Sequence, residues 1–240
     1  MLKFFGRGSG FSDEHNGAYF VDGDRLILID CPLITFIRLK NEGLEHFTGC
    51  KINQIIIIIT HTHSDHVGGL ALTLHYIRFV WQIDTIVIGP SDKVRTDLDY
   101  LLTNLDGCSK DHYKLVTVEE YKAMAGDSGN WLKRSILTKH VPELDGKCFG
   151  YNLEIEGKNV VYTGDSNSLE NYLPYTLPGS ILYTECSTID SGVHIYIDKI
   201  LAYKEYFQDN NIEVYLMHLD KEEKATKIIE GTGIQIAPLA

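Results

Sequence analysis

The residues of this chain best suited to chemistry lie in one short segment, residues 60–69, which reads THTHSDHVGG. It places His61, His63, Asp65 and His66 within six positions. Imidazole nitrogens and carboxylate oxygens are the ligands that borderline divalent metals such as zinc prefer. A solvated loop that is rich in histidine is the alternative, but so many donors in such close spacing favour ligation. This HxHxDH segment is predicted to bind metal.

A buried strand is predicted directly before the HxHxDH segment. Residues 55–59 are consecutive isoleucines, and β-branched side chains pack well on a sheet that is covered on both faces. The apolar run stops abruptly where the polar segment begins. Side chains at such a strand end are placed where the fold can present them to an ion.

Three other polar residues also follow apolar, strand-like runs, namely His140, Asp165 and His218. Each one alone is more often a structural histidine or a turn residue, but their joint occurrence favours ligation. The HxHxDH segment cannot direct all its donors at one tetrahedral ion, so two ions are expected. Asp165 is expected to bridge them, because the two oxygens of one carboxylate can bind one ion each.

The rest of the chain alternates predicted strands and helices. A hairpin is predicted around Asp22-Gly23-Asp24, while Pro32 and Ser91 are expected at the start of helices. The predicted strands cover residues 18–21, 25–30, 51–59, 85–89, 135–139, 148–155, 159–162, 181–184 and 213–217, and the predicted helices residues 32–42, 68–82, 91–105, 196–209 and 221–230. This alternation predicts an α/β fold with two sheets sandwiched between helices.

Length and charge narrow the class of protein. The 240 residues show no linker or repeat and fit a single domain over residues 1–240. The formal net charge is −11, and no run of Lys and Arg forms a basic stripe. Grip on long nucleic acid depends largely on phosphate neutralisation, so a nucleic-acid partner is not expected. Small anionic substrates stay open, because bound metal ions supply local positive charge.

Cysteine usage and hydropathy indicate the compartment. The five cysteines are scattered and form no C-x-x-C, which favours free thiols in a reducing compartment. No apolar stretch is long enough to span a bilayer, and residues 1–6 lack the apolar core of a signal peptide. We expect a cytoplasmic protein without a membrane partner.

The ordered set of donors resembles the metallo-β-lactamase family over essentially the whole chain. The resemblance implies an αββα sandwich with a dinuclear site at one edge, between the sheets. It implies two divalent ions, with zinc expected and manganese, iron or nickel as alternatives. The implied ligands are His61, His63 and His140 for one ion and Asp65, His66 and His218 for the other, with Asp165 as the bridge.

Further residues resemble the branch that contains ribonuclease Z and related phosphodiesterases. They are residues 6–10, which read GRGSG, the pair Asp30-Cys31, residues 183–187, which read YTECS, and His194. In that branch a Glu and a His form a proton-donating pair, and Glu185 and His194 match it. A solvated carboxylate for Glu185 and a helix start for His194 are the alternatives.

The resemblance implies a hydrolase that cleaves a phosphodiester. A hydroxide held between the ions would attack phosphorus, and His194, oriented by Glu185, would protonate the leaving oxygen. Asp65 is expected to be catalytic as well as a ligand. Ribonuclease Z has a long arm, rich in Gly and Pro, that grips transfer RNA. This chain lacks the arm and is acidic, so a small phosphodiester such as a cyclic nucleotide is expected.

Other functions are alternatives to this one. On the same fold they are a ribonuclease Z-like RNA endonuclease and a thioester or lactone hydrolase. In another class, a metal-stabilised regulatory module without turnover is disfavoured by the complete ligand set. Related enzymes imply a homodimer. Residues 6–10 could offer N–H groups to a phosphate, although a tight turn explains the glycines as well, and His15 could border the site.

Overall fold

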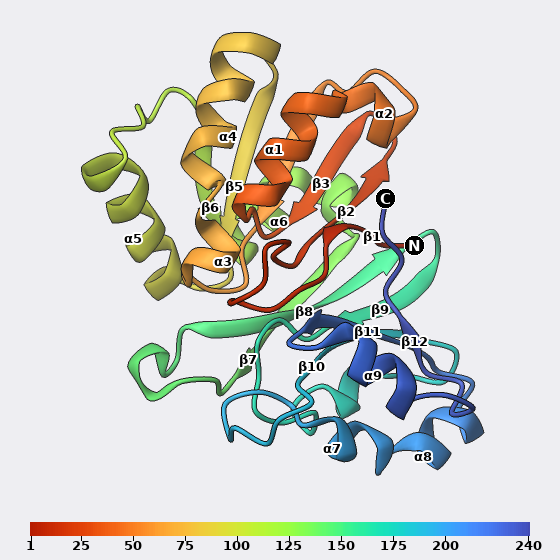
Figure 1. The fold of residues 1–240 in the computed structure, drawn as a ribbon. Coiled ribbons are helices and arrows are strands. Elements are labelled where there is room, and N and C mark those ends of the chain that lie inside the picture. The colour runs from red at the N-terminus through yellow and green to blue at the C-terminus, as the bar shows by residue number, and fades with distance from the viewer. The chain divides into compact units, whose positions relative to one another are not determined.

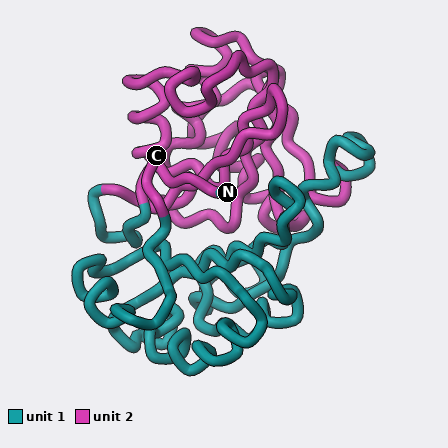
Figure 2. The backbone as a smooth tube through the Cα atoms, turned by 90° about the vertical axis from the view of Figure 1, so that its right-hand side faces the viewer, with its two compact units in different colours: residues 1, 7–13, 122–237 teal, residues 2–6, 14–121, 238–240 magenta.

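The computed structural model describes all 240 residues, and its chain divides into two compact units (Figure 2). The N-terminal unit comprises residues 2–6, 14–121 and 238–240, and the C-terminal unit comprises residues 1, 7–13 and 122–237. Each unit contains one six-stranded mixed sheet with its own helices (Figure 1). The predicted α/β class with two sheets is confirmed.

The sheet of the N-terminal unit has the strand order β1-β2-β3-β4-β5-β6. Strands β1 to β3 pair antiparallel, and strands β3 to β6 pair parallel. The strands are β1 Lys3–Gly6, β2 Gly17–Asp22, β3 Arg25–Ile29, β4 Gln54–Ile58, β5 Asp84–Gly89 and β6 Lys114–Thr117. The helices are α1 Leu33–Glu42, α2 Leu44–Thr48, α3 Ser64–Val67, α4 Leu70–Tyr76, α5 Asp92–Tyr100 and α6 Val118–Ala125, which contains the boundary between the units.

The strand predicted to be buried is β4, in the interior of this sheet. All four isoleucines of β4 are fully buried, and the strand lies between β3 and β5. Because β3, β4 and β5 run parallel, their carboxyl ends meet at one edge of the sheet. Asp30 follows β3 and the HxHxDH segment follows β4, so both lie at this edge.

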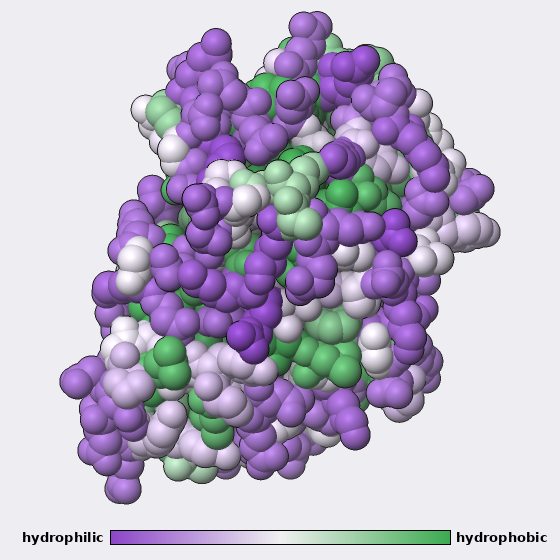
Figure 3. All heavy atoms as spheres, turned by 180° about the vertical axis from the view of Figure 1, so that it is seen from behind, coloured by the Kyte–Doolittle hydropathy of each residue, from purple (hydrophilic) through white to green (hydrophobic).

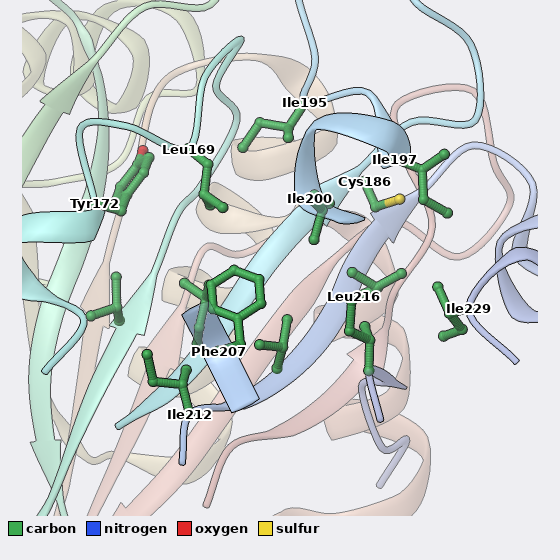
Figure 4. Packing of buried hydrophobic residues seen from close by; sticks show 14 of the residues in the cluster. Leu169, Tyr172, Cys186, Ile195, Ile197, Ile200, Phe207, Ile212, Leu216 and Ile229 are labelled. Atoms are coloured by element: carbon green, nitrogen blue, oxygen red, sulfur yellow. The ribbon is translucent and has the colours of Figure 1, made fainter. Parts of the chain in front are cut away.

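The sheet of the C-terminal unit has the order β12-β11-β10-β9-β8-β7. Strands β7 to β9 pair antiparallel, and β9 to β12 pair parallel. The strands are β7 Leu132–Thr138, β8 Cys148–Ile155, β9 Lys158–Tyr162, β10 Ile181–Cys186, β11 Glu213–Leu219 and β12 Gln235–Ile236. The helices are α7 Ile197–Leu201, α8 Lys204–Asp209 and α9 Glu222–Ile228. Figure 4 shows Ile200 of α7 and Phe207 of α8 in the apolar cluster with Leu216 of β11.

Several element boundaries differ from the sequence predictions. The predicted helix 68–82 begins only at Leu70, and it ends in a π-helical turn at Ile77–Trp81. A side chain at Gly69 would collide with the carbonyl oxygen of Pro32, so this turn approaches α1 closely. The predicted helix 196–209 is two helices, α7 and α8. β1, β6 and α6 were not predicted, because they are short and lack a clear apolar period.

The surface is mostly hydrophilic on the face shown in Figure 3, with apolar residues in small patches. No helix has both the length and the apolar character needed to cross a membrane. All five cysteines are free thiols, as predicted, and only Cys50 is exposed.

Candidate metal centre and proton-donating pair

The HxHxDH segment is folded around the short helix α3, which the sequence did not predict. The amides of His66 and Val67 donate to the carbonyl of His63, and this turn places Asp65 and His66 close together. The segment is tied to the end of β3 by a bond of 2.7 Å from the Cys31 amide to the His66 carbonyl. The candidate ligands of this segment are therefore fixed at the carboxyl ends of the parallel strands β3 and β4.

Asp30 fixes the orientation of His66. His66 Nδ1 lies 2.8 Å from Asp30 Oδ2, and both side chains are fully buried. The other carboxylate oxygen accepts the Thr60 amide at 2.7 Å. A ring that donates from Nδ1 to a carboxylate keeps Nε2 as a lone-pair donor for a metal. The backbone of Asp30 has a φ of 60°, an uncommon conformation for a residue other than glycine.

The donors of the segment approach one another in two pairs. His61 Nε2 lies 3.1 Å from His63 Nδ1, and His66 Nε2 lies 3.3 Å from Asp65 Oδ2. The Thr60 hydroxyl is 3.1 Å from His61 Nδ1 and can accept its proton, which leaves His61 Nε2 with a lone pair. The pairs match the division of this segment between two ions that the family resemblance implies.

The C-terminal unit brings its three predicted ligands together. His140 Nε2 lies 3.7 Å and His218 Nε2 3.4 Å from the same oxygen, Asp165 Oδ2. All three side chains are buried. His140 Nδ1 donates to the Val193 carbonyl at 2.8 Å, so its Nε2 also keeps a lone pair. Two imidazole nitrogens and a carboxylate oxygen together form a set of ligand atoms that fits a divalent ion such as zinc.

His218 lies within β11, whereas the sequence predicted that the strand ends at residue 217. Glu185 pairs with Met217 and Cys186 with Leu219, so His218 is the extra residue of a β-bulge. Its φ of 50° is in the left-handed region, where side chains other than glycine are strained. Bulges re-aim side chains next to functional sites, and this one sets the direction of His218.

Glu185 and His194 form a close pair in the same unit. His194 Nδ1 is 2.5 Å from Glu185 Oε2. Glu185 is fully buried within β10 and also accepts the amide of Ser166, so it is not a solvated carboxylate. His194 precedes α7, which begins at Ile197. Glu185 is therefore not a solvated carboxylate, and His194 is not at the start of a helix.

The environment of this pair suits proton transfer. Burial raises the pKa of Glu185, and the hydrogen bond from His194 opposes that rise. The His194 ring lies 4.8 Å from the His140 ring and 5.3 Å from the His218 ring, measured between centroids. Because Nδ1 of His194 is held by Glu185, Nε2 is the nitrogen that can exchange a proton with another group.

The remaining sequence candidates have structural partners. Gly8 forms a parallel bridge to Leu219, and the Ser9 amide donates to the Leu219 carbonyl at 2.9 Å. The glycines at residues 6–10 therefore support close backbone pairing. His15 is half-buried in the N-terminal unit. Sequence reasoning missed Thr60 and assigned no role to Asp30, although an acidic residue at the end of a predicted apolar strand was a usable signal that Asp30 has a function.

Comparison with known proteins gives a consistent family. A family model described as Anti-Pycsar protein Apyc1 matches residues 1–235. A protein of that name from Bacillus phage 010DV004 is 31% identical over 237 residues, which is 90% of this chain and 88% of that protein. Another from Bacillus phage BSP38 is 28% identical over 238 residues, or 91% of this chain and 88% of its own length.

A solved structure shows the same fold. The metallo-β-lactamase fold protein YhfI from Bacillus subtilis superposes with a TM-score of 0.72 at 18% identity, covering 99% of this chain and 96% of that one. The αββα fold of the metallo-β-lactamase type, implied by the sequence, is thereby confirmed.

Proposed function

The chain belongs to the Anti-Pycsar protein Apyc1 family and is a metal-dependent hydrolase, and we propose that it opens a small phosphodiester, namely a cyclic nucleotide. The observation that carries this proposal is the Glu185–His194 pair, with 2.5 Å between carboxylate and imidazole. It lies beside His218, one of the proposed ligands. An alkoxide is a poor leaving group, so a positioned proton donor favours this reaction class.

Two divalent ions are part of the proposal. The proposed ligand sets are His61, His63 and His140 for one ion and Asp65, His66 and His218 for the other, with Asp165 between them. The donor pairs within the HxHxDH segment and the convergence of His140 and His218 on Asp165 support it. When bound, such ions supply hydroxide at neutral pH and offset charge on phosphoryl oxygens.

The residues of the chain then have distinct roles. His194 donates a proton from Nε2 to the departing oxygen, and the buried Glu185 carboxylate keeps Nδ1 protonated and the ring in place. Asp65 is proposed to orient the attacking water as well as to ligate. Asp30 holds His66, and the Val193 carbonyl holds His140, so that each ring presents Nε2.

Three observations support a small substrate. The segment between His140 and Asp165 folds into the hairpin β8–β9, with no extended arm that could grip transfer RNA. The net charge of −11 disfavours a polyanionic ligand. Membership of the Anti-Pycsar Apyc1 family is consistent with cyclic nucleotides. Zinc as the native metal, a homodimer and a cytoplasmic location belong to the same proposal.

A substrate panel tests the function. The purified, metal-loaded protein is assayed with 3′,5′-cyclic mononucleotides, bis-p-nitrophenyl phosphate, transfer-RNA precursor, S-lactoylglutathione and a lactone. We expect turnover of the cyclic mononucleotides and of the chromogenic diester alone. Cleavage of the RNA, or of the thioester or lactone without the cyclic nucleotides, would replace the proposed substrate class.

A further inference from the structure

Phe11 is an aromatic side chain that the fold leaves entirely in solvent. Its relative accessibility is 107%, whereas the next most exposed phenylalanine, Phe79, reaches 65%. Single exposed apolar residues are common on protein surfaces, so exposure alone has no meaning. The position of Phe11 in the C-terminal unit gives the exposure its significance.

The loop that carries Phe11 is fixed next to a proposed metal ligand. The Ser9 amide donates to the Leu219 carbonyl at 2.9 Å, and the Leu219 amide donates to the Arg7 carbonyl at 2.8 Å. Leu219 directly follows His218. The loop therefore begins at a parallel bridge beside the bulge that orients His218.

Hydrogen bonds hold this loop at its start and at its tip. Arg7 binds Glu222 with two nitrogens, at 2.7 and 2.6 Å, and also donates to the Ala237 carbonyl. At the tip, the amide and the hydroxyl of Ser12 both donate to the Ser9 carbonyl, at 2.9 and 2.8 Å. Phe11 lies inside this closed turn, which makes it a projecting ring on a braced loop.

Chain geometry limits how far the ring can be from the ligands. Two residues span at most about 7 Å, so the Phe11 Cα lies within that distance of Ser9. Ser9 is itself hydrogen-bonded to the residue after His218. A base that extends from a phosphate at His218 toward this loop would meet the Phe11 ring.

We propose that Phe11 is a substrate-binding residue that stacks on the nucleobase of the cyclic nucleotide. This inference rests on the proposed function. Aromatic stacking accepts every base, because each has a π-face, and it contributes to binding rather than to bond cleavage. Gly10 directly precedes Phe11, and Gly8 lies at the bridge to Leu219. Neither glycine has a side chain that could cover the Phe11 ring.

The kinetic test compares Phe11→Ala with Phe11→Trp and with the matched control Leu177→Ala. Leu177 is an exposed apolar residue of the same unit that precedes β10, whereas Glu185 lies near the carboxyl end of that strand. With 3′,5′-cyclic AMP, Phe11→Ala should raise KM about tenfold, while kcat stays within about twofold. Phe11→Trp and Leu177→Ala should keep the wild-type KM.

A substrate without a base isolates the stacking contribution. With ribose 3′,5′-cyclic phosphate, wild-type protein and Phe11→Ala should have the same KM. A KM that rises equally for both substrates indicates a structural effect of the substitution and overturns the stacking role. An unchanged KM for cyclic AMP overturns it as well, and a changed mass in solution would then assign Phe11 to a contact between copies.

Fluorescence supplies a measurement that does not depend on turnover. In the metal-loaded Phe11→Trp variant, 5′-AMP should quench the emission of the new tryptophan, and in Leu177→Trp it should not. If wild-type protein opens none of the 3′,5′-cyclic mononucleotides, the proposed function fails. The quenching experiment then tests the Phe11 proposal by itself. Quenching of Phe11→Trp by 5′-AMP supports a contact between residue 11 and the base, and no quenching overturns that contact.

Discussion

At the scale of single residues, Asp30 shows how a side chain outside the proposed ligand set orients a proposed ligand, His66. It accepts His66 Nδ1 at 2.8 Å and the Thr60 amide at 2.7 Å, and it is fully buried. Partners of this kind typically change metal affinity 10- to 100-fold when they are removed.

Asp30→Asn should therefore lower zinc affinity by about 10- to 100-fold without unfolding the protein. The neutral amide keeps the shape of the carboxylate but no longer favours the His66 tautomer that exposes Nε2. Competition with a chromogenic chelator measures the affinity, and circular dichroism checks the fold. The exposed Asp84 at the start of β5 provides the control Asp84→Asn. Equal affinities in the two variants would deny Asp30 its positioning role.

His194 should affect catalysis while leaving metal binding in place. His194→Ala is expected to lower kcat for a cyclic nucleotide by about 10²- to 10⁴-fold, the usual contribution of a general acid. The loss should be much smaller with bis-p-nitrophenyl phosphate, because nitrophenolate leaves without protonation. Metal analysis accompanies both assays. The same loss on both substrates would argue against proton donation by His194.

At the scale of elements, β11 explains a donor that the sequence located only roughly. His218 was predicted to follow a strand, but it is the bulged residue within one, with a φ of 50°. A bulge depends on the register between β10 and β11, which no local pattern in either strand reveals. His218 could be proposed as a ligand from its type and position, whereas its strained backbone geometry could not be predicted.

The same distinction holds for the rest of the fold. The strands β4, β5 and β9 could be predicted as runs rich in β-branched residues, and β8 could be predicted because apolar residues alternate along it. The carboxylate of Asp30 next to His66 could not, since it requires β3 and β4 to be parallel neighbours. Local sequence identified the chemistry of the donors. Strand neighbours, which are long-range contacts, determine their hydrogen bonds.

At the scale of the whole molecule, buried acidic groups with high pKa values predict weakness at alkaline pH. Burial raises the pKa of Tyr19, Tyr113 and the Cys31 thiol to about 12 in each case. Their ordinary values are 10.0 for tyrosine and 9.0 for cysteine. Between these values the unfolded chain has released protons that the folded chain retains, so rising pH favours unfolding.

These three groups should therefore leave the melting temperature constant below about pH 9. They should lower it as the pH rises toward 12. The buried Tyr113 hydroxyl has no hydrogen-bond partner. Tyr113→Phe should thus keep neutral-pH stability and flatten the alkaline decline, while the exposed Tyr100→Phe should leave the decline unchanged. Thermal melts from pH 7 to 11 measure it, and parallel curves for both variants would contradict the assignment.

The proposed dinuclear centre makes a further prediction about the molecule as a whole, because one carboxylate is proposed to bind both ions. Asp165 lies in the C-terminal unit, and its Oδ2 is near both His140 and His218. If its carboxylate bridges two ions, Asp165→Ala should weaken both, including the one assigned mainly to His61 and His63. Native mass spectrometry should then show that both ions are lost or weakly bound, together with loss of turnover. The exposed Asp145 of the same unit gives the control Asp145→Ala. Retention of two tightly bound ions by Asp165→Ala would contradict the bridge, and retention of one would restrict Asp165 to a single ion.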